Sequence, residues 1–176
     1  MAVTCLVVMG VSGAGKSTIA RVVADRLDWP MAEGDDFHPE KNVAKMRAGV
    51  PLTDADRGPW LRTLREWIVA RAEAGESSVM TCSALKESYR DILRGSGEGP
   101  VKVRVRFLHL RGSHEEIGER MVTRTGHFMP TTLLESQLAD LEPLTREEDG
   151  VTVDVDAEPE EVTDTAMERL GLEAGD

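Results

Sequence analysis

The sequence predicts an α/β fold built on a five-stranded parallel sheet with helices on both faces. Strand-like apolar runs alternate with helical patterns along almost the whole chain, and this alternation is typical of parallel sheets joined by right-handed crossovers. The first strand is also apolar without interruption, which indicates burial on both of its faces. In such a sheet, ligands bind where the carboxyl ends of the strands meet.

The first half of the chain contains three apolar segments of strand length, at residues 3–9, 30–33 and 79–82. Helices are predicted between them from apolar residues that recur every three to four positions, with Pro at a helix start and Gly at a helix end. These helices lie at residues 18–27, at 39–49 and from about 59 onward.

The second half of the chain continues the same alternation. The Gly-rich residues 95–100 form a predicted surface loop. Ser113 and Thr132 are each followed by Glu three positions later, which is the spacing of a capping box at a helix start. The elements predicted here are helices at 86–94, 113–125, 132–141 and 159–171, and strands at 103–110 and 151–155.

A glycine-rich loop stands between the first strand and the first helix. Its backbone N–H groups can surround phosphate oxygens, Lys16 can reach the β- and γ-phosphates, and the Ser17 hydroxyl can bind Mg²⁺. A chance Gly-rich turn is the alternative, but the Gly-Lys-Ser sequence with a strand before it and a helix after it argues against chance. The predicted nucleotide-binding residues of this loop are Gly10, Ser12, Gly13, Ala14, Gly15, Lys16, Ser17 and Thr18.

The length of 176 residues fits one domain over residues 1–176, large enough for a core without disulfides. Cys5 and Cys82 both fall in predicted strands and are interpreted as reduced core residues. No apolar run is long enough to cross a bilayer. We therefore expect a soluble, cytoplasmic protein that does not bind membranes. The sequence leaves the oligomeric state open, and a homodimer is one arrangement that it allows.

The formal net charge of −11 is unevenly distributed. Residues 142–176 contain 13 acidic and two basic side chains, which account for the whole excess, so the rest of the chain is neutral overall. A neutral body without a basic field argues against nucleic-acid binding. The acidic end is interpreted as a solvated helix face and tail.

Polar and charged residues follow the predicted strands at their carboxyl ends. A carboxylate, several cations and a Gly-His segment around one phosphate site are what phosphoryl transfer to a small anionic alcohol requires. Taken singly, many of these residues could instead cap helices, fill the core or lie in solvent. The main candidates are Asp35, Arg57, Trp60, Lys86, Arg90 and residues 126–130.

The chain shares further residue strings with one group of enzymes. Beyond the loop, they include Cys82-Ser83-Ala84-Leu85-Lys86 and Asp56-Arg57 followed by Pro59-Trp60, with other matches between residues 3 and 156. In these strings the chain resembles the small P-loop gluconate kinases, which are more distantly related to shikimate and adenylate kinases. It departs from them at Glu33, where the family usually has Asp.

The resemblance implies a P-loop kinase fold with a small lid segment, and transfer of the γ-phosphate of ATP, with Mg²⁺, to the 6-hydroxyl of D-gluconate. Asp35 is then the group that accepts or orients the hydroxyl proton, or alternatively an acceptor in the outer shell of Mg²⁺. Arg57, Lys86 and Arg90 are candidates for the substrate carboxylate because guanidinium and ammonium groups bind anions.

Other side chains are predicted to contact the substrate or the transferring phosphate. Arg120 and Arg124 lie four positions apart and could cover the phosphoryl group, with Arg124 taking part in catalysis. Candidates for the sugar hydroxyls, each of which could also be a structural hydrogen bonder, are His38, Ser83, His127 and Gln137, and Trp60 is a further candidate substrate contact.

Two other classes of protein fit the sequence less well. A regulatory GTPase would need a guanine-reading Asn-Lys-x-Asp segment, which is absent. A non-catalytic nucleotide-binding module would have no need for Asp35, Arg57 or Lys86. Within the enzymes, the alternative is a kinase of another small anionic alcohol, either shikimate-like or a different aldonate.

We expect residues 120–137 to act as a lid, because Gly126 lowers the cost of a hinge between two predicted helices. In amide hydrogen exchange, this segment should be weakly protected in the free protein and become protected with nucleotide and gluconate together, while residues 3–9 stay protected throughout. Arg124→Ala should lower kcat more than it weakens gluconate binding. Equal protection with and without ligands, or an unchanged kcat, would contradict the lid.

Overall fold

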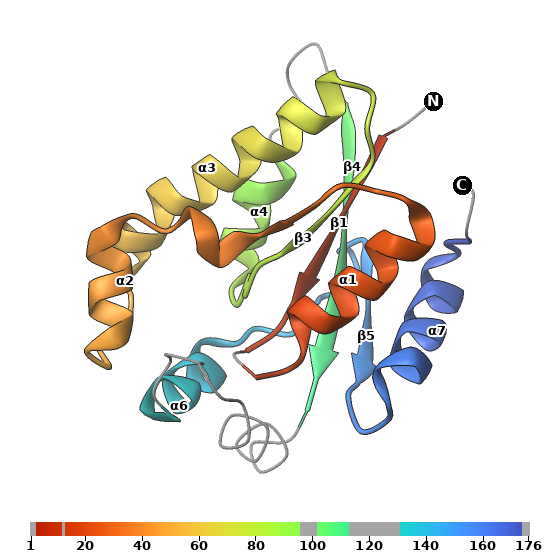
Figure 1. The fold of residues 1–176 in the computed structure, drawn as a ribbon. Coiled ribbons are helices and arrows are strands. Elements are labelled where there is room, and N and C mark those ends of the chain that lie inside the picture. Colours follow the sequence, from red (N-terminus) through yellow and green to blue (C-terminus); the bar gives the residue numbers. More distant parts are fainter. Residues whose placement is uncertain (1–2, 12, 96–101, 113–130, 174–176) are drawn as a thin grey trace.

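The computed structural model describes residues 3–11, 13–95, 102–112 and 131–173 (Figure 1). Within them, five strands form one sheet in the order β2-β3-β1-β4-β5, and every neighbouring pair is parallel. The predicted five-stranded parallel sheet is therefore confirmed. The strands are β1 Val3–Met9, β2 Met31–Glu33, β3 Ser78–Thr81, β4 Val103–Arg111 and β5 Gly150–Asp154.

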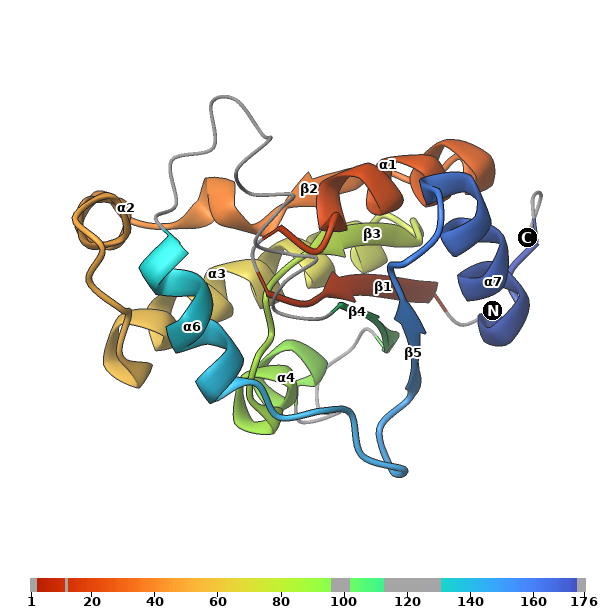
Figure 2. The ribbon, with the colours of Figure 1, turned by 90° about the horizontal axis from the view of Figure 1, so that it is seen from below.

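Helices cover both faces of this sheet, as predicted (Figures 1 and 2). Helices α1 (Lys16–Leu27) and α7 (Pro159–Leu170) pack on one face, and α3 (Asp54–Glu73) and α4 (Glu87–Arg94) pack together on the other. Three further elements complete the described chain, and they are the 3₁₀ helix η1 (Gly34–Phe37), α2 (Glu40–Arg47) and α6 (Thr131–Asp140). The predicted helix at 113–125 lies outside the described residues, as does nearly all of the predicted loop at 95–100.

The core is centred on β1, in which residues 5–9 are completely buried. Burying a Val, Leu or Ile side chain stabilises the fold by about 1.5–3 kcal/mol relative to leaving it exposed. Both cysteines lie in this core, where burial raises the pKa of each thiol to about 12. The same core includes side chains from helices on both faces of the sheet, among them Ile19 and Val23 of α1 and Leu61, Leu64 and Ile68 of α3.

Helix α3 begins at Asp54, five residues before the predicted start at Pro59. A capping box explains the earlier start, because Thr53 Oγ1 accepts a hydrogen bond from Asp56 N (3.1 Å) and Asp56 Oδ2 accepts one from Thr53 N (3.0 Å). The earlier start places Arg57 on the helix, three residues before Trp60. Both side chains therefore lie on the same helix face.

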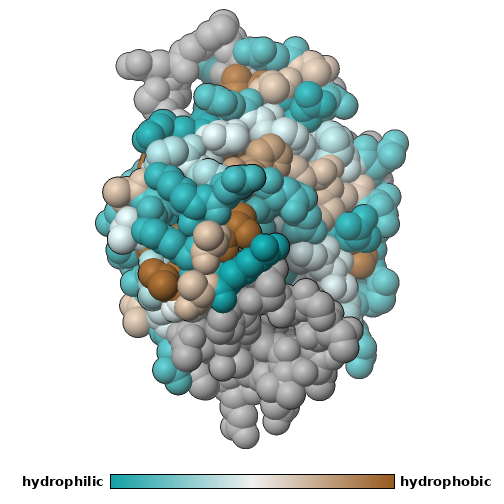
Figure 3. Space-filling view, turned by 60° about the vertical axis from the view of Figure 1, so that its left-hand side comes forward, coloured by the Kyte–Doolittle hydropathy of each residue, from teal (hydrophilic) through white to brown (hydrophobic). Residues whose placement is uncertain are grey.

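The surface of the described residues is mostly polar. The face in Figure 3 carries only small, separated apolar patches. Val50, 46% exposed, is the one large apolar side chain in the described part of the chain that reaches far into solvent. None of the described helices combines the length and the apolar composition that a bilayer span requires.

A buried ion pair joins α4 to the segment that leads into β5. Arg90 Nε lies 2.6 Å from Glu148 Oε2, and the two side chains are 0% and 4% exposed. The other donors of Arg90 bond to Glu148 Oε1 and to the main-chain carbonyls of Ala84, Leu85 and Pro143. Arg94 Nη1 also donates to Glu148 Oε2 (2.8 Å). This cluster fixes the segment between β3 and α4, which also carries Ser83.

We predict that Glu148→Gln lowers the free energy of unfolding by about 3–5 kcal/mol, because removing one partner leaves a buried guanidinium without its counter-ion. The neighbouring exposed residue provides the control, since Glu147→Gln should change the unfolding free energy little. Chemical denaturation measures both. A Glu148→Gln protein as stable as the Glu147→Gln protein would contradict the role of the pair.

The same pair predicts how stability depends on pH. Burial by itself would raise the pKa of Glu148, but the hydrogen bonds from Arg90, Arg94 and the Thr145 N–H outweigh it and lower the pKa from 4.5 to about 2. Because the folded-state pKa is depressed, this stabilisation is present above about pH 4.5 and is lost as the pH falls toward 2.

Candidate active site

The loop between β1 and α1 is shaped to receive phosphate. Gly10, Gly13 and Gly15 have φ angles of 147°, 84° and 94°, a region that other residues rarely adopt. A Cβ atom at Gly10 would also lie 2.8 Å from the carbonyl oxygen of Leu110. The loop leads directly into α1, so the first N–H groups of that helix face the same point. This is the predicted phosphate-binding loop.

Lys16, the first residue of α1, turns back over this loop. Its Nζ donates to the carbonyl oxygens of Gly10 (2.9 Å) and Val11 (3.1 Å). These bonds hold the ammonium group at the place where the loop would bind phosphate. Ala14 and Gly15 complete the backbone of the turn, whereas Thr18 lies on the exposed side of α1. Ser12 lies outside the described residues.

Glu33, at the carboxyl end of β2, reaches the hydroxyl of Ser17. Its Oε2 accepts hydrogen bonds from Ser17 Oγ (2.9 Å) and from Thr81 Oγ1 (2.6 Å) at the end of β3. Ser17 is the predicted magnesium ligand, and hard oxygen donors are what Mg²⁺ prefers. Glu33 and Ser17 thus form a pair of oxygen groups beside the phosphate loop.

Asp35 follows Glu33 in η1 and projects toward the loop. Its side chain is 58% exposed, and its Oδ1 lies 3.7 Å from Nε2 of His38. His38 is 3% exposed and stacks on Trp60, with ring centroids 4.0 Å apart and planes 17° apart. Trp60 in turn donates from Nε1 to the carbonyl oxygen of Gly34 (2.8 Å), the residue before Asp35. The tryptophan therefore supports both the carboxylate and the imidazole.

Burial lowers the pKa of His38 to about 4; the Arg57 charge also lowers it, whereas Asp35 opposes the shift. His38 is consequently a neutral imidazole at physiological pH.

Arg57 enters the site from the first turn of α3. Its side chain is 8% exposed, and its guanidinium donates to the Tyr89 hydroxyl (2.9 Å) and lies 3.6 Å from Asp140 Oδ2 of α6. The Tyr89 hydroxyl donates to Asp54 Oδ1, which also accepts from Lys86 Nζ (3.3 Å). Arg57 is thus a nearly buried cation whose carboxylate neighbour is distant, and it suits an anionic ligand.

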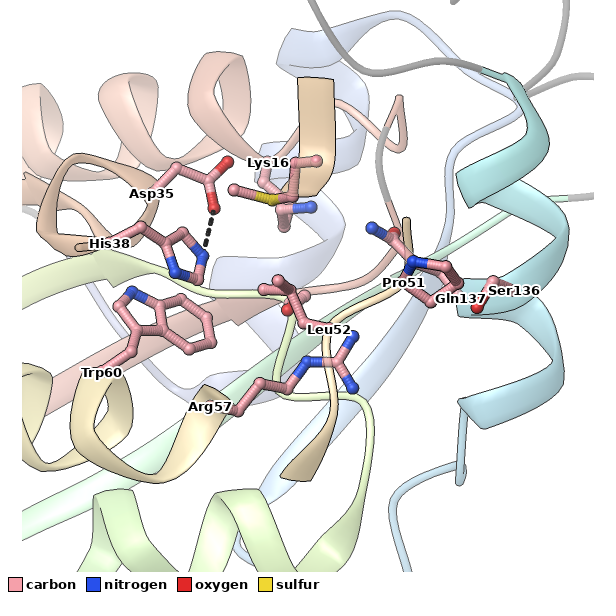
Figure 4. A pocket seen from close by; sticks show the side chains of 11 residues that line it. Lys16, Asp35, His38, Pro51, Leu52, Arg57, Trp60, Ser136 and Gln137 are labelled. Atoms are coloured by element: carbon pink, nitrogen blue, oxygen red, sulfur yellow. Dashed lines mark ion pairs between the residues drawn. The ribbon is translucent and has the colours of Figure 1, made fainter. Parts of the chain in front are cut away.

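These side chains enclose one pocket of about 480 Å³, including its open mouth (Figure 4). Asp35 and His38 point toward each other near Lys16, and Arg57 lies on the other side of the pocket. The pocket unites predicted residues from five separate segments of the chain. They are Lys16, Asp35, His38, Arg57, Trp60, Ser83 and Gln137.

Arg90 differs from its predicted role as a substrate-carboxylate ligand. It is fully buried, its donors are engaged by Glu148 and by main-chain carbonyls, and it does not line the pocket. The physical reason is that its ion-pair partner, Glu148, lies 58 residues away in the sequence, so the four-residue spacing of Lys86 and Arg90 does not reveal it. Lys86 also stands outside the pocket lining, paired with Asp54.

Three other predicted site residues lie outside the described residues, namely Arg120, Arg124 and His127. Most of the predicted lid falls there too, while α6 covers residues 131–140. The sequence analysis missed several pocket residues that lie close to residues it did select. Apolar side chains supply three of them, which are Met46, Pro51 and Leu52, and Ser136, beside Gln137, is the fourth.

Comparisons with known proteins agree with this geometry. A family model described as an AAA domain matches residues 6–144. A gluconokinase of Gluconobacter oxydans is 45% identical over 96% of this chain and 92% of its own length. A crystal structure of a gluconokinase from Sinorhizobium meliloti superposes with a TM-score of 0.84 at 45% identity, covering 96% of this chain and 91% of that one. A sugar kinase from Janibacter, solved without ligand, gives a TM-score of 0.89 at 51% identity, covering 97% and 95%.

A phosphate loop at the end of a parallel sheet, facing a pocket with a carboxylate and a buried arginine, defines an ATP-dependent kinase of the P-loop type. These relatives align with nearly the whole chain. Their sequence identities of about 45% indicate membership of the same family and more than a shared fold. The chain belongs to the gluconokinase family.

Proposed function

We propose that this protein transfers the γ-phosphate of ATP to the 6-hydroxyl of D-gluconate, giving 6-phospho-D-gluconate and ADP. The observation that carries the proposal is the pocket in which Lys16 and the Asp35 carboxylate lie opposite the nearly buried Arg57. A site with these groups suits an acceptor that has a hydroxyl at one end and a carboxylate at the other.

The loop residues and Lys16 would hold the phosphates of ATP through backbone N–H groups and one ammonium. The oxygen atoms of Ser17 and Glu33 fit Mg²⁺, with Ser17 as its direct ligand. When bound, Mg²⁺ would neutralise charge that develops on the phosphate oxygens. The longer side chain of Glu33, compared with the Asp usual in the family, is what reaches Ser17 here.

In the proposed reaction, the acceptor hydroxyl oxygen attacks the γ-phosphorus and the bond to the bridging oxygen of ADP breaks. Asp35 takes or orients the hydroxyl proton, since its carboxylate is accessible and lies near Lys16 at the same end of the pocket. Lys16 would stabilise the charge of the transferring group. Asp35 could alternatively act in the outer shell of Mg²⁺, and the two roles predict different behaviour of the Asn variant.

Arg57 is the proposed ligand of the substrate carboxylate. Tyr89 holds its guanidinium in place, and a planar carboxylate can bind in two-pronged fashion. Lys86 pairs with Asp54, the carboxylate that accepts the hydrogen bond of the Tyr89 hydroxyl, and would thereby help to hold Tyr89 beside Arg57. Ser83, His38 and Gln137 line the remaining pocket and are proposed to meet the hydroxyl groups of the sugar acid. The oligomeric state, the contribution of Arg120, Arg124 and His127, and a cytoplasmic location remain predictions from the sequence.

We predict that ADP release with MgATP requires D-gluconate and is much weaker with glucose. Glucose lacks the carboxylate, and leaving a buried cation unpaired costs on the order of 2–5 kcal/mol of binding. A coupled ADP-release assay over gluconate, other aldonates, shikimate and glucose measures this preference. Equal activity on gluconate and glucose would contradict the proposed function, and a stronger response to shikimate or another aldonate would replace the substrate.

Variants on α3 refine the same assay. Arg57→Ala should raise KM for gluconate far more than KM for ATP, because Arg57 is expected to touch only the acceptor. Arg62→Ala is the matched control, since Arg62 is exposed on the same helix and should behave as wild type. An Arg57→Ala enzyme with an unchanged KM for gluconate would argue against Arg57 as the ligand of the substrate carboxylate.

We further predict that Lys16→Ala and Asp35→Asn both fold and both lower kcat by roughly 10²-fold or more. Lys16→Ala should also weaken ATP binding, whereas Asp35→Asn should leave it nearly intact. Asp36→Asn, at the exposed neighbouring position, is the control and should keep wild-type kcat. If Asp35→Asn abolishes Mg²⁺-dependent ATP binding while the residual complex reacts normally, the outer-shell role of Asp35 is the correct one.

A further inference from the structure

One buried polar side chain beside the pocket has no part in the proposed chemistry. Asn42 of α2 is 0% exposed. Its Nδ2 lies 3.2 Å from Nδ1 of His38 and 3.1 Å from the carbonyl oxygen of Asp56. Burying an amide is costly unless its hydrogen bonds are satisfied, so this placement calls for a physical reason.

The Asp56 carbonyl determines how the amide of Asn42 is oriented. A carbonyl oxygen can only accept a hydrogen bond, so the NH₂ group of Asn42 must face it. The reversed amide would bring two oxygens together. The NH₂ group has two hydrogens, and the second is directed at His38 Nδ1. Within the described residues, Asn42 Oδ1 has no hydrogen-bond partner. The orientation of the amide therefore follows from the two contacts of its NH₂ group.

This orientation determines the proton on His38. Because Nδ1 receives a hydrogen bond from Asn42, the single proton of a neutral imidazole must be on Nε2. Nε2 faces Asp35 Oδ1 at 3.7 Å, a distance at which a polar N–H still attracts a carboxylate although it is too long for a hydrogen bond. Turning the ring over would present carbon atoms to both groups, and the stack on Trp60 holds its plane.

We infer that Asn42 is a positioning residue that holds His38 as the Nε2–H tautomer, so that a neutral donor faces the Asp35 carboxylate and the acceptor hydroxyl. This inference rests on the proposed role of Asp35. In the other tautomer, a nitrogen lone pair would face the carboxylate, repel it, and offer a second acceptor for the proton that Asp35 is proposed to receive. The His38 N–H instead draws Asp35 toward a single orientation.

The experiment uses the full chain with ¹⁵N-labelled histidine and two variants, Asn42→Asp and Asn42→Ala. In long-range ¹H–¹⁵N spectra, bare and protonated ring nitrogens are distinct, and a His38→Gln protein identifies which of the four histidines is His38. Wild type should show a bare Nδ1. The Asp variant should show a protonated Nδ1, because a carboxylate can only accept. The Ala variant should show a mixture of tautomers.

Steady-state kinetics with MgATP and gluconate form the second part of the test. Both Asn42 variants should lower kcat on the order of 10-fold or more, with KM for ATP little changed, because the tautomer affects the proton acceptor rather than the nucleotide. Lys45→Ala is the matched control. Lys45 lies on the same helix and pairs with the Asp56 side chain (2.7 Å), so its removal loosens the same α2–α3 contact without touching His38. This control should keep the wild-type tautomer and kcat.

The outcomes separate tautomer control from a merely structural role. A wild-type His38 with its proton on Nδ1 would overturn the inference, as would an Asn42→Asp protein with changed tautomer and normal kcat. Equal loss of kcat in Asn42→Ala and Lys45→Ala, with His38 unchanged in both, would make Asn42 a packing residue. Failure of wild type to phosphorylate gluconate would contradict the proposed function instead, while the spectra, which need no substrate, would still decide the tautomer.

Discussion

The site depends on the close approach of η1 to the end of β3 at Gly34. A Cβ atom there would lie 2.2 Å from the carbonyl oxygen of Thr81, a distance that real Cβ atoms do not reach, so only glycine fits. The contact is reinforced because Gly34 N donates to Thr81 Oγ1 (3.2 Å) and Gly34 O accepts from Trp60 Nε1. Glu33 on one side of this glycine reaches Ser17, and Asp35 on the other side reaches the pocket. A larger residue at position 34 would displace both acids together.

Two arginines are buried in the described part of the chain, and they show how a charge can serve structure or ligand binding. Arg90 has an ion pair at 2.6 Å and several carbonyl acceptors, so its charge is compensated inside the protein. Arg57 is almost as buried, but its nearest carboxylate in the described residues is 3.6 Å away and its hydrogen bond is to a neutral hydroxyl. Buried charges need strong partners. The arginine that lacks a close one is the arginine that lines the pocket.

Two neutral side chains, Trp60 and Asn42, hold the reactive groups of the pocket in place. Trp60 joins the backbone before Asp35 to the ring of His38, and Asn42 joins that ring to the first turn of α3. The capping box of α3 and the Lys45 ion pair hold the same turn in place. The acid, the imidazole and Arg57 are therefore held by one connected set of contacts between η1, α2 and α3, in which the contacts of Trp60 and Asn42 reach His38 directly.

The alternation of strands and helices, the parallel sheet and the phosphate loop could be predicted from the sequence, because they follow from local periodicity and from glycines spaced closely within one turn. Family strings also located Asp35, Arg57 and Ser83. The early start of α3 was missed because Pro59 suggested a helix beginning, whereas Thr53 and Asp56 provide the cap. Three contacts could not be predicted in this way and are seen only in the folded chain: Arg90 pairs with Glu148, Glu33 reaches Ser17, and Asn42 contacts His38 from a neighbouring helix. An arginine, a glutamate or an asparagine can each bind a ligand or stabilise the fold. Which of these roles a given side chain takes depends on how deeply it is buried and on which partner the fold places beside it.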